Sequence, residues 1–350
     1  MTDIPATIHT VTFNILSPQL CSNDIFDMCD EDSINGKARW KRIAKLTTRW
    51  MKEERIMALQ ELCDRWEPSL NVHFIKNNYH LLSKQYSNGK LGVGIAYPKD
   101  IYELVQYNVF NVGLSYHQIL IDGLSMRNII KQQSTPNFDA NEINTTVTHL
   151  NEAIYAENKC VSIKLRHKND PTKEFWVATY HMPCKYDKPT IMYSHIISVM
   201  SHLNHLCCDL PVIFMGDLNI VPGSVSYDIL TNRTIPADLL KLFKYSGNRS
   251  YPFKSSDPDF NPTDRLITFA SAWKDINGKE PNYTNVCITS KKTFIDTLDY
   301  TFYKGVIPIK CEFDNRTTNY PDACNQIPHP TSICPSDHIP ITGTFVYPSM

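Results

Sequence analysis

The chain of 350 residues is predicted to be an α/β protein, because short apolar segments that end in polar residues alternate along it with amphipathic segments. Two of the short segments, at 56–59 and 212–215, are apolar throughout, as expected of buried strands. Helical patterns at 37–54 and 189–208 precede them. A strand that follows a helix and ends in polar groups is a common way for an α/β protein to build a site.

The segment 211–224 carries the clearest local signal. The apolar strand at 212–215 is expected to deliver Asp217 and Asn219 at its carboxyl end. If strand geometry persists, the alternation of side chains puts both residues on the same side. An Asp-x-Asn turn closed by the Pro-Gly pair at 222–223 explains the same residues without any chemistry. Other strand ends along the chain favour the functional interpretation.

Three earlier strands also end in polar residues. Asn14 lies near the end of the strand predicted at 8–16, Glu61 follows the strand at 56–59, and His181 follows a strand at 175–179. A carboxylate such as Glu61 is a hard oxygen ligand of the kind that Mg²⁺ takes, and His181 can donate to a phosphate oxygen. The structural alternatives are a turn at Asn14, a surface glutamate and a hydrogen-bonded structural histidine.

Two late stretches complete this set of polar strand ends. Asp299 lies in an alternating strand at 297–303, where a buried carboxylate is unfavourable unless it has a partner. Asp337 and His338 come directly before the final strand at 341–346. A carboxylate that pairs with His338 would fix its tautomer and raise its basicity, and Asp299 is the candidate for this orienting role.

Composition limits the classes of partner. The net charge is −1 and the sequence pI is ≈ 6.8, so a polyanionic substrate must be met by a local site or a metal ion. The 11 cysteines include no Cys-x-x-Cys pair and predict reduced thiols, with a zinc site as the alternative. The first residues have no apolar signal-peptide core, and no apolar run is long enough for a membrane span. We therefore expect a cytoplasmic protein without a membrane association, with the nucleus left open.

The polar strand ends occur within six short motifs. In chain order these are Thr-Phe-Asn-Ile-Leu-Ser at 12–17, Leu-Gln-Glu-Leu at 59–62, Tyr-His-Met at 180–182, Gly-Asp-Leu-Asn at 216–219, Leu-Asp-Tyr at 298–300 and Ser-Asp-His at 336–338. From residue 8 to about 346, the chain resembles the endonuclease/exonuclease/phosphatase (EEP) superfamily. It looks most like the branch of the Ccr4-type deadenylases, nocturnin, the Angel proteins and 2′-phosphodiesterase. Asn-Ile-Leu-Ser-Pro at 14–18, Tyr-Thr-Asn at 283–285 and Phe-Tyr at 302–303 support this branch.

The resemblance implies the EEP or DNase I-like fold, a four-layer α/β/β/α sandwich of two mixed sheets flanked by helices. We expect a single EEP-type catalytic domain over 1–350, with loop insertions at about 98–157 and 245–282. The activity it implies is that of a metal-dependent phosphoesterase that uses Mg²⁺, with Mn²⁺ as a possible substitute.

The resemblance also implies roles for individual residues. Glu61, Asn14 and Asp337 would hold the metal. Asp217 would orient or deprotonate the attacking water, and His338, held by Asp299, would contact the phosphate oxygens. The expected catalytic residues are Asp217, Asn219, His338, His181 and Asp299, and the expected substrate-binding residues are Asn14, Asn219, His181 and Phe294. Phe294 occupies the position at which deadenylases stack an aromatic ring on adenine.

The chain departs from the deadenylase pattern at two places. Tyr186 replaces the proline five residues after the motif histidine, and Lys-Leu-Gly-Val-Gly at 90–94 replaces an Asp-Gly-Cys-Ala segment. These departures concern specificity for poly(A) and not the hydrolytic chemistry.

From the resemblance we expect a monomeric nuclease or phosphodiesterase that hydrolyses RNA 3′ ends, including poly(A), 2′,5′-linked or 2′,3′-cyclic phosphates, with RNA or a nucleotide as its substrate. One alternative is a phosphatase acting on inositol phosphates, sphingomyelin or dinucleotides. The other is a catalytically silent scaffold, disfavoured because no expected catalytic position is missing.

Overall fold

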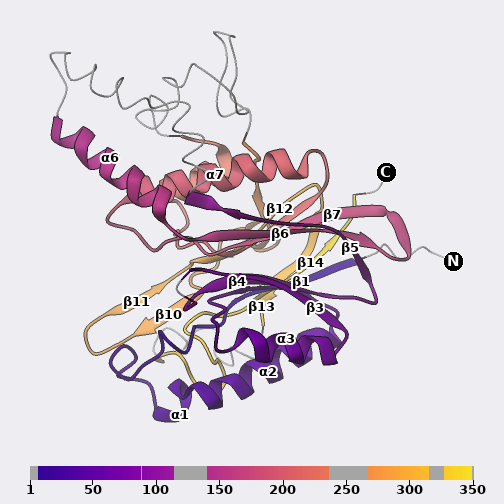
Figure 1. Cartoon of the computed structure of the whole chain (residues 1–350), viewed down its shortest axis with the longest axis horizontal. Helices are drawn as coiled ribbons and strands as arrows, with labels where there is room; N and C mark the ends of the chain where they lie inside the picture. Colours follow the sequence, from indigo (N-terminus) through magenta and orange to yellow (C-terminus); the bar gives the residue numbers. More distant parts are fainter. Residues whose placement is uncertain (1–6, 88, 114–139, 236–265, 315–326, 349–350) are drawn as a thin grey trace, which may run out of the picture.

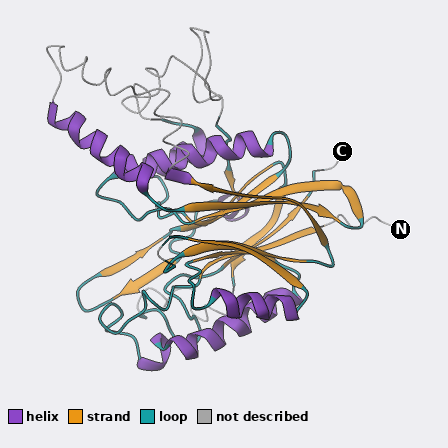
Figure 2. Cartoon of the chain, viewed as in Figure 1, coloured by secondary structure: helices purple, strands orange, loops and turns teal. Residues whose placement is uncertain are grey.

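The computed structural model describes residues 7–87, 89–113, 140–235, 266–314 and 327–348. Two six-stranded sheets pack face to face, and helices cover the outer face of each sheet (Figures 1 and 2). This arrangement confirms the predicted four-layer α/β/β/α sandwich.

The first sheet has the strand order β13-β14-β1-β2-β4-β3. Its strands are β1 (Thr7–Asn14), β2 (Ile56–Gln60), β3 (Tyr79–Gln85), β4 (Gly92–Pro98), β13 (Ile307–Phe313) and β14 (Ile341–Val346). The helices on its outer side are α1 (Glu31–Ile34), α2 (Gly36–Lys52) and α3 (Glu67–Lys76).

The second sheet has the strand order β5-β6-β7-β8-β12-β9. Its strands are β5 (Tyr102–Asn111), β6 (Lys159–His167), β7 (Asp170–Tyr180), β8 (Val212–Asp217), β12 (Asp299–Lys304) and β9 (Ala270–Ser271). The remaining helices are α6 (Ala140–Tyr155), α7 (Pro189–Cys207), α8 (Val225–Asn232) and α10 (Ala272–Asn277), of which α6 and α7 cover its outer face. A separate hairpin of β10 (Asn285–Ile288) and β11 (Thr293–Asp296) extends from one end of the molecule (Figure 1).

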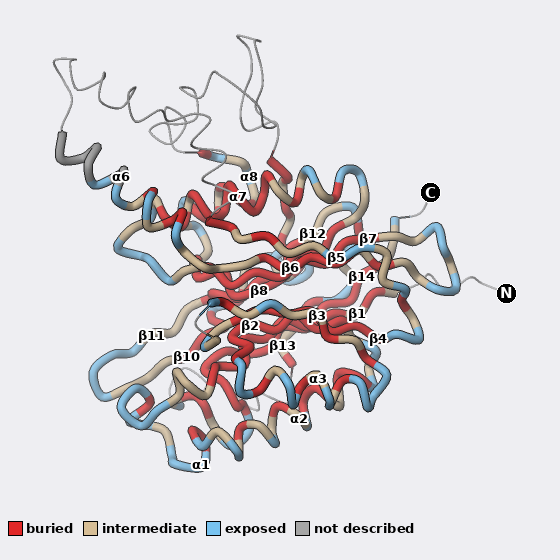
Figure 3. The backbone as a smooth tube through the Cα atoms, viewed as in Figure 1, coloured by how far each residue is buried: buried red, intermediate tan, exposed pale blue. Residues whose placement is uncertain are grey.

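The alternation of side chains along each central strand divides the core into layers. In β8, Val212 and Phe214 pack with the helices of the second sheet, whereas Ile213 and Met215 pack between the two sheets. A third cluster lies between the first sheet and its helices. Most residues of the central strands are therefore buried (Figure 3). Asp217 continues the phase of Ile213 and Met215, so it lies at the end of the layer between the sheets.

Strand directions bring the predicted polar strand ends to one edge. β1 pairs with β2 in parallel, and β7 pairs with β8 in parallel, so their carboxyl ends share an edge of each sheet. β14 runs antiparallel to β1, and β12 runs antiparallel to β8, so these two strands begin at that same edge. Asp299, the first residue of β12, lies directly opposite Asp217.

Several local expectations are wrong within the described residues. The sequence predicts a loop insertion at about 98–157, but β5 forms the edge of the second sheet and α6 packs on α7. The interval 245–282 contains β9 and α10. β5 is only partly buried, so its residues lack the clear alternation by which a strand is identified. Helices α3 and α8 were not predicted from the sequence.

Two expectations from composition can be compared with the described part of the chain. Its ten cysteines are all free thiols, and none of them belongs to a group with the geometry of a metal site. None of the described helices is both long and apolar enough to cross a bilayer.

Candidate active site

Asp217 lies at the centre of the polar groups that meet at this edge. Its Oδ2 atom is 3.0 Å from Nδ2 of Asn14, 3.4 Å from Nε2 of His181 and 3.6 Å from Nε2 of His338. All four side chains are buried. They come from the ends of β1, β7 and β8 and from the segment before β14, so the site is shared by the two sheets.

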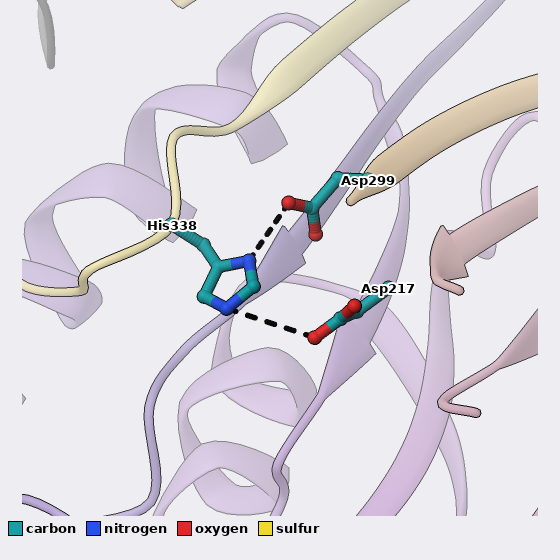
Figure 4. Close-up of side chains that lie close together, drawn as sticks. All are labelled: Asp217, Asp299 and His338. Carbon is teal, nitrogen blue, oxygen red and sulfur yellow. Dashed lines mark hydrogen bonds and ion pairs between the residues drawn. The ribbon is translucent and has the colours of Figure 1, made fainter. Parts of the chain in front are cut away.

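His338 is held between two carboxylates (Figure 4). Its Nδ1 atom is 2.7 Å from Oδ2 of Asp299, and the Thr284 hydroxyl donates to the same oxygen at 2.7 Å. Burial alone lowers the pKa of His338, but the negative charges of Asp299, Asp217 and Asp337 outweigh this effect and raise it well above its usual value. These charges therefore favour the protonated ring, which can donate from both nitrogens.

Burial raises the pKa of Asp299 to about 6, although the charge of His338 opposes this shift. Asp217, Asp299 and His338 offer potential ligand atoms that lie within 4.8 Å of one another, and these residue types can bind a metal ion. The short contact between His338 Nδ1 and Asp299 is a charge-assisted hydrogen bond. We therefore regard these two residues as a hydrogen-bonded pair.

Glu61 follows β2 directly and lines the cleft at this edge. Its Oε2 atom accepts from the backbone N–H of Ser17 at 2.7 Å, and Oε1 accepts from Nδ2 of Asn14 at 3.1 Å. Its φ of 60° is uncommon for a residue other than glycine and turns the chain sharply after the strand. The carboxylate is a hard oxygen donor with lone pairs to spare, so it fits a magnesium ion.

Asn14 contacts both Glu61 and Asp217 through its amide nitrogen, while its Oδ1 atom accepts from the backbone N–H of Leu16 at 2.9 Å. In this arrangement its N–H groups position the two carboxylates. Its oxygen lies on the side of the turn after β1, where it stabilises that turn.

Asn219 and Asp337 also line the cleft. The expectation that strand geometry continues to Asn219 is wrong, because β8 ends at Asp217 and Asn219 has a φ of 50°. Its backbone N–H donates to Oδ1 of Asp217 at 3.0 Å, and its Nδ2 donates to the Met182 carbonyl at 2.8 Å. Asp337 accepts from Nδ2 of Asn285 at 3.2 Å.

The close approach of β7 and β8 requires glycine at position 216. A Cβ atom there would lie 2.0 Å from the carbonyl oxygen of Tyr180. With glycine, Asp217 and His181 can lie side by side at the ends of adjacent strands.

The cleft has a volume of ≈ 640 Å³, within the range of small-molecule sites. One part of it is lined by Phe294 of β11 and by Tyr186, whose ring centroids are 6.3 Å apart with an interplanar angle of 43°. The ammonium group of Lys292 lies 5.0 Å from the centroid of Phe294. An aromatic and cationic wall therefore shares the cleft with the acidic and histidine groups.

Some residues around the site were not identified from the sequence. Tyr86 and Asn158 both donate to the backbone carbonyl of His181, at 3.3 and 2.8 Å, and both line the cleft. Thr284, which donates to Asp299, lies in the Tyr-Thr-Asn motif, but the motif alone does not assign it this contact. The contacts of Tyr86 and Asn158 join segments far apart in the chain, and no local pattern indicates them.

Arg39 of α2 was also missed, although a local signal was present. It is fully buried and donates to the carbonyls of Ile15, Leu16 and Pro335, so it joins the segment after Asn14 to the segment before His338. Arg39 lies one helical turn before the buried Ile43, in phase with the apolar face of the helix. A charged residue at such a position predicts a buried polar contact.

The fold has a two-sheet core, and acidic, amide and histidine side chains meet in a cleft at one edge of it. A sequence model of the Endonuclease/Exonuclease/phosphatase family matches residues 11–338, and the chain belongs to this family. Human 2′,5′-phosphodiesterase 12 is 35% identical over 81 residues, a match that covers 21% of this chain and 13% of that protein.

Two solved structures show the same fold. One is ANGEL2, a 2′,3′-cyclic phosphatase, in complex with adenosine-2′,3′-vanadate, with a TM-score of 0.64, 16% identity and coverage of 98% of this chain and 96% of that chain. The other is the human Nocturnin catalytic domain with a bound sulfate anion, with a TM-score of 0.58, 15% identity and coverage of 98% and 94%.

Proposed function

We propose that this protein is a metal-dependent phosphodiesterase that hydrolyses phosphoesters at the 3′ ends of RNA. The observation that carries this proposal is that Asp217 and His338, which form one cluster with Asp299, line the same cleft as Phe294. A phosphoryl group could bind at the cluster while an attached base stacks on the ring, and such stacking is worth about 1–3 kcal/mol. The adenosine-2′,3′-vanadate bound to ANGEL2 supports a nucleotide substrate.

In this proposal the ion is Mg²⁺, with Mn²⁺ as a possible substitute. Glu61 would hold it directly, Asn14 would position the Glu61 carboxylate, and Asp337 would contribute through the ion's water shell. When bound, the ion polarises the phosphoryl group and offsets its charge.

The chain's own residues would perform the proton transfers and stabilise the developing charge. Asp217 would orient the attacking water and accept its proton, because its Oδ2 atom lies at the centre of the polar groups that meet at the cleft. His338 and His181 would donate to the non-bridging oxygens as negative charge develops there. Removing one such donor costs about 10²–10³ in rate. Asn219 would contribute by holding Asp217 and the Met182 carbonyl in place.

A substrate screen tests the proposal. Purified protein with Mg²⁺ is incubated with poly(A), mixed-sequence RNA, RNA ending in a 2′,3′-cyclic phosphate, 2′,5′-linked oligoadenylate and NADPH. We expect hydrolysis of at least one RNA substrate, its loss in EDTA and in His338→Ala, and its retention in His205→Ala, which replaces an exposed histidine of α7. The proposal would be contradicted if the protein hydrolysed none of these RNAs, or if His338→Ala were as active as the wild-type protein.

The same screen tests the small-molecule alternative when inositol phosphates and sphingomyelin are added. If the cleft binds adenine on Phe294, Phe294→Ala should raise KM for adenine-bearing substrates by about tenfold with little change in kcat. Faster hydrolysis of an inositol phosphate or sphingomyelin than of any RNA would favour the alternative. Calorimetric titration that detects no binding of Mg²⁺ would favour a scaffold.

A further inference from the structure

A second cavity lies beside the cleft, on the side of α2 and α3. We call it the tryptophan groove, and it is lined by Pro18, Lys37, Trp40, Arg65, Trp66 and Ser69. Its volume is ≈ 360 Å³, enough for a small aromatic group. None of the catalytic roles proposed above uses these residues.

The two tryptophans differ in what they can offer to a ligand. Their ring centroids are 6.1 Å apart, with an interplanar angle of 46°. Trp66 is buried, and the guanidinium group of Arg39 lies 5.1 Å from its ring centroid. Trp40 is only partly buried, so its ring is the one that a ligand can reach.

Two cationic side chains line the groove together with the tryptophan rings. Lys37 and Arg65 are both exposed, and within the described parts of the chain neither side chain forms an ion pair or hydrogen bond. The groove lining contains no carboxylate. Aromatic rings combined with unpaired cations suit a ligand that carries both flat rings and negative charge, as single-stranded nucleic acid does.

The groove and the cleft are adjacent, because the same two loops line both. In the first loop Leu20 lines the cleft and Pro18 lines the groove, and two residues of chain span at most about 7 Å. In the second loop Glu61 lines the cleft and Arg65 the groove. The loops are joined by the hydrogen bond between Ser17 and Glu61 and by another between Gln19 and Asp64 at 2.9 Å.

We propose that the tryptophan groove binds a nucleotide of the single-stranded RNA substrate at a distance from the scissile phosphate, with a base against Trp40 and phosphates near Lys37 and Arg65. This inference rests on the RNA-directed function proposed above. Adjacency to the catalytic cleft favours RNA over an acidic peptide, which would match the charges but has no need to lie beside the cleft.

Binding without hydrolysis tests the groove independently of catalysis. Fluorescein-labelled mixed-sequence RNA dodecamer is titrated in EDTA, and anisotropy is recorded at several salt concentrations. The double variant Lys37→Glu/Arg65→Glu should weaken binding by about tenfold or more. The slope of the logarithm of the affinity against the logarithm of the salt concentration should become shallower by the amount expected for about two lost phosphate contacts. The control Lys45→Glu, on the same helix but outside the groove, should bind within about twofold of wild type. Trp40→Leu should weaken binding by about tenfold while largely preserving the salt dependence.

Activity on two substrate lengths supplies the second measurement. The double variant should lower the ratio of kcat/KM for the dodecamer to kcat/KM for a dinucleotide by about tenfold. If the protein binds the dodecamer through Lys37 and Arg65 but hydrolyses no RNA, the groove is supported and the proposed function fails. If it hydrolyses both lengths and the double variant changes neither binding nor the ratio, the function stands and the groove proposal is overturned. Tighter binding of poly-glutamate than of RNA in the same titration also overturns it.

Discussion

Replacing Asp299 by asparagine would remove the negative charge behind His338 while keeping the shape of the side chain. The Oδ2 atom of Asp299 accepts from His338 and from Thr284, both at 2.7 Å. An amide oxygen can accept the same two bonds. The amide nitrogen would then occupy the position of Oδ1, a buried atom without a hydrogen-bond partner among the described residues. The Asp299→Asn variant is therefore expected to fold with its site geometry retained.

The loss of charge sets the size of the effect. A carboxylate and an imidazolium ion about 4 Å apart attract each other by about 4 kcal/mol at an effective dielectric constant of 20. A neutral hydrogen bond retains about 1 kcal/mol of this stabilisation. The remaining loss of about 3 kcal/mol corresponds to a decrease in kcat of about 10²-fold. Because the pKa of His338 should also fall, the alkaline limb of the pH profile should move to lower pH.

The assay measures kcat against pH with the RNA that the wild-type protein hydrolyses fastest, together with the melting temperature. Asp314→Asn is the matched control, because Asp314 is a buried carboxylate that accepts from Trp50 at 2.7 Å and pairs with Arg49 away from the cleft. The control should lose stability and retain kcat. A kcat for Asp299→Asn within about threefold of wild type, or an unchanged pH profile, would refute the charge argument.

Three further changes address the metal, the backbone and the core. Glu61→Gln should weaken Mg²⁺ binding in calorimetry by at least about tenfold, and an unchanged affinity would show that the ion binds elsewhere. Gly216→Ala should lower the free energy of unfolding by about 3 kcal/mol in urea denaturation, because its Cβ would approach the Tyr180 carbonyl to 2.0 Å. Equal stability would contradict the close approach. Burial lowers the pKa of His195 to about 4, so the unfolded chain binds a proton at this residue more readily than the folded chain does. The neutral, buried ring of His195 therefore contributes to stability above pH 6.5, and this contribution is lost as the pH falls towards 4. This amounts to about 3 kcal/mol, and His195→Gln should reduce the dependence of unfolding free energy on pH in that interval.

Local patterns in the sequence were enough to predict the central strands and the residues at their ends. The apolar run at 212–215 became β8, and Asp217 follows it in the phase of the buried face between the sheets. The same pattern placed His181 and Glu61 directly after β7 and β2. These predictions succeeded because periodicity within a strand determines which side chains share a face.

Local patterns were less informative where an element depends on contacts with distant residues. The edge strand β5 is only partly buried, and its position depends on pairing with β6 across a gap of many residues. Strand alternation also misplaced Asn219, because the hydrogen bonds of Asn219 to Asp217 and Met182 turn the chain after β8.

The sequence by itself determined that this is an α/β protein with acids, amides and histidines at the ends of its strands, since these features depend on neighbours within a few residues. Only the tertiary structure decided that Tyr86 and Asn158 hold His181, and that Trp40 and Arg65 line one groove beside the cleft. The physical reason is that such contacts join separate segments, and their geometry is set by the packing of the two sheets and their helices.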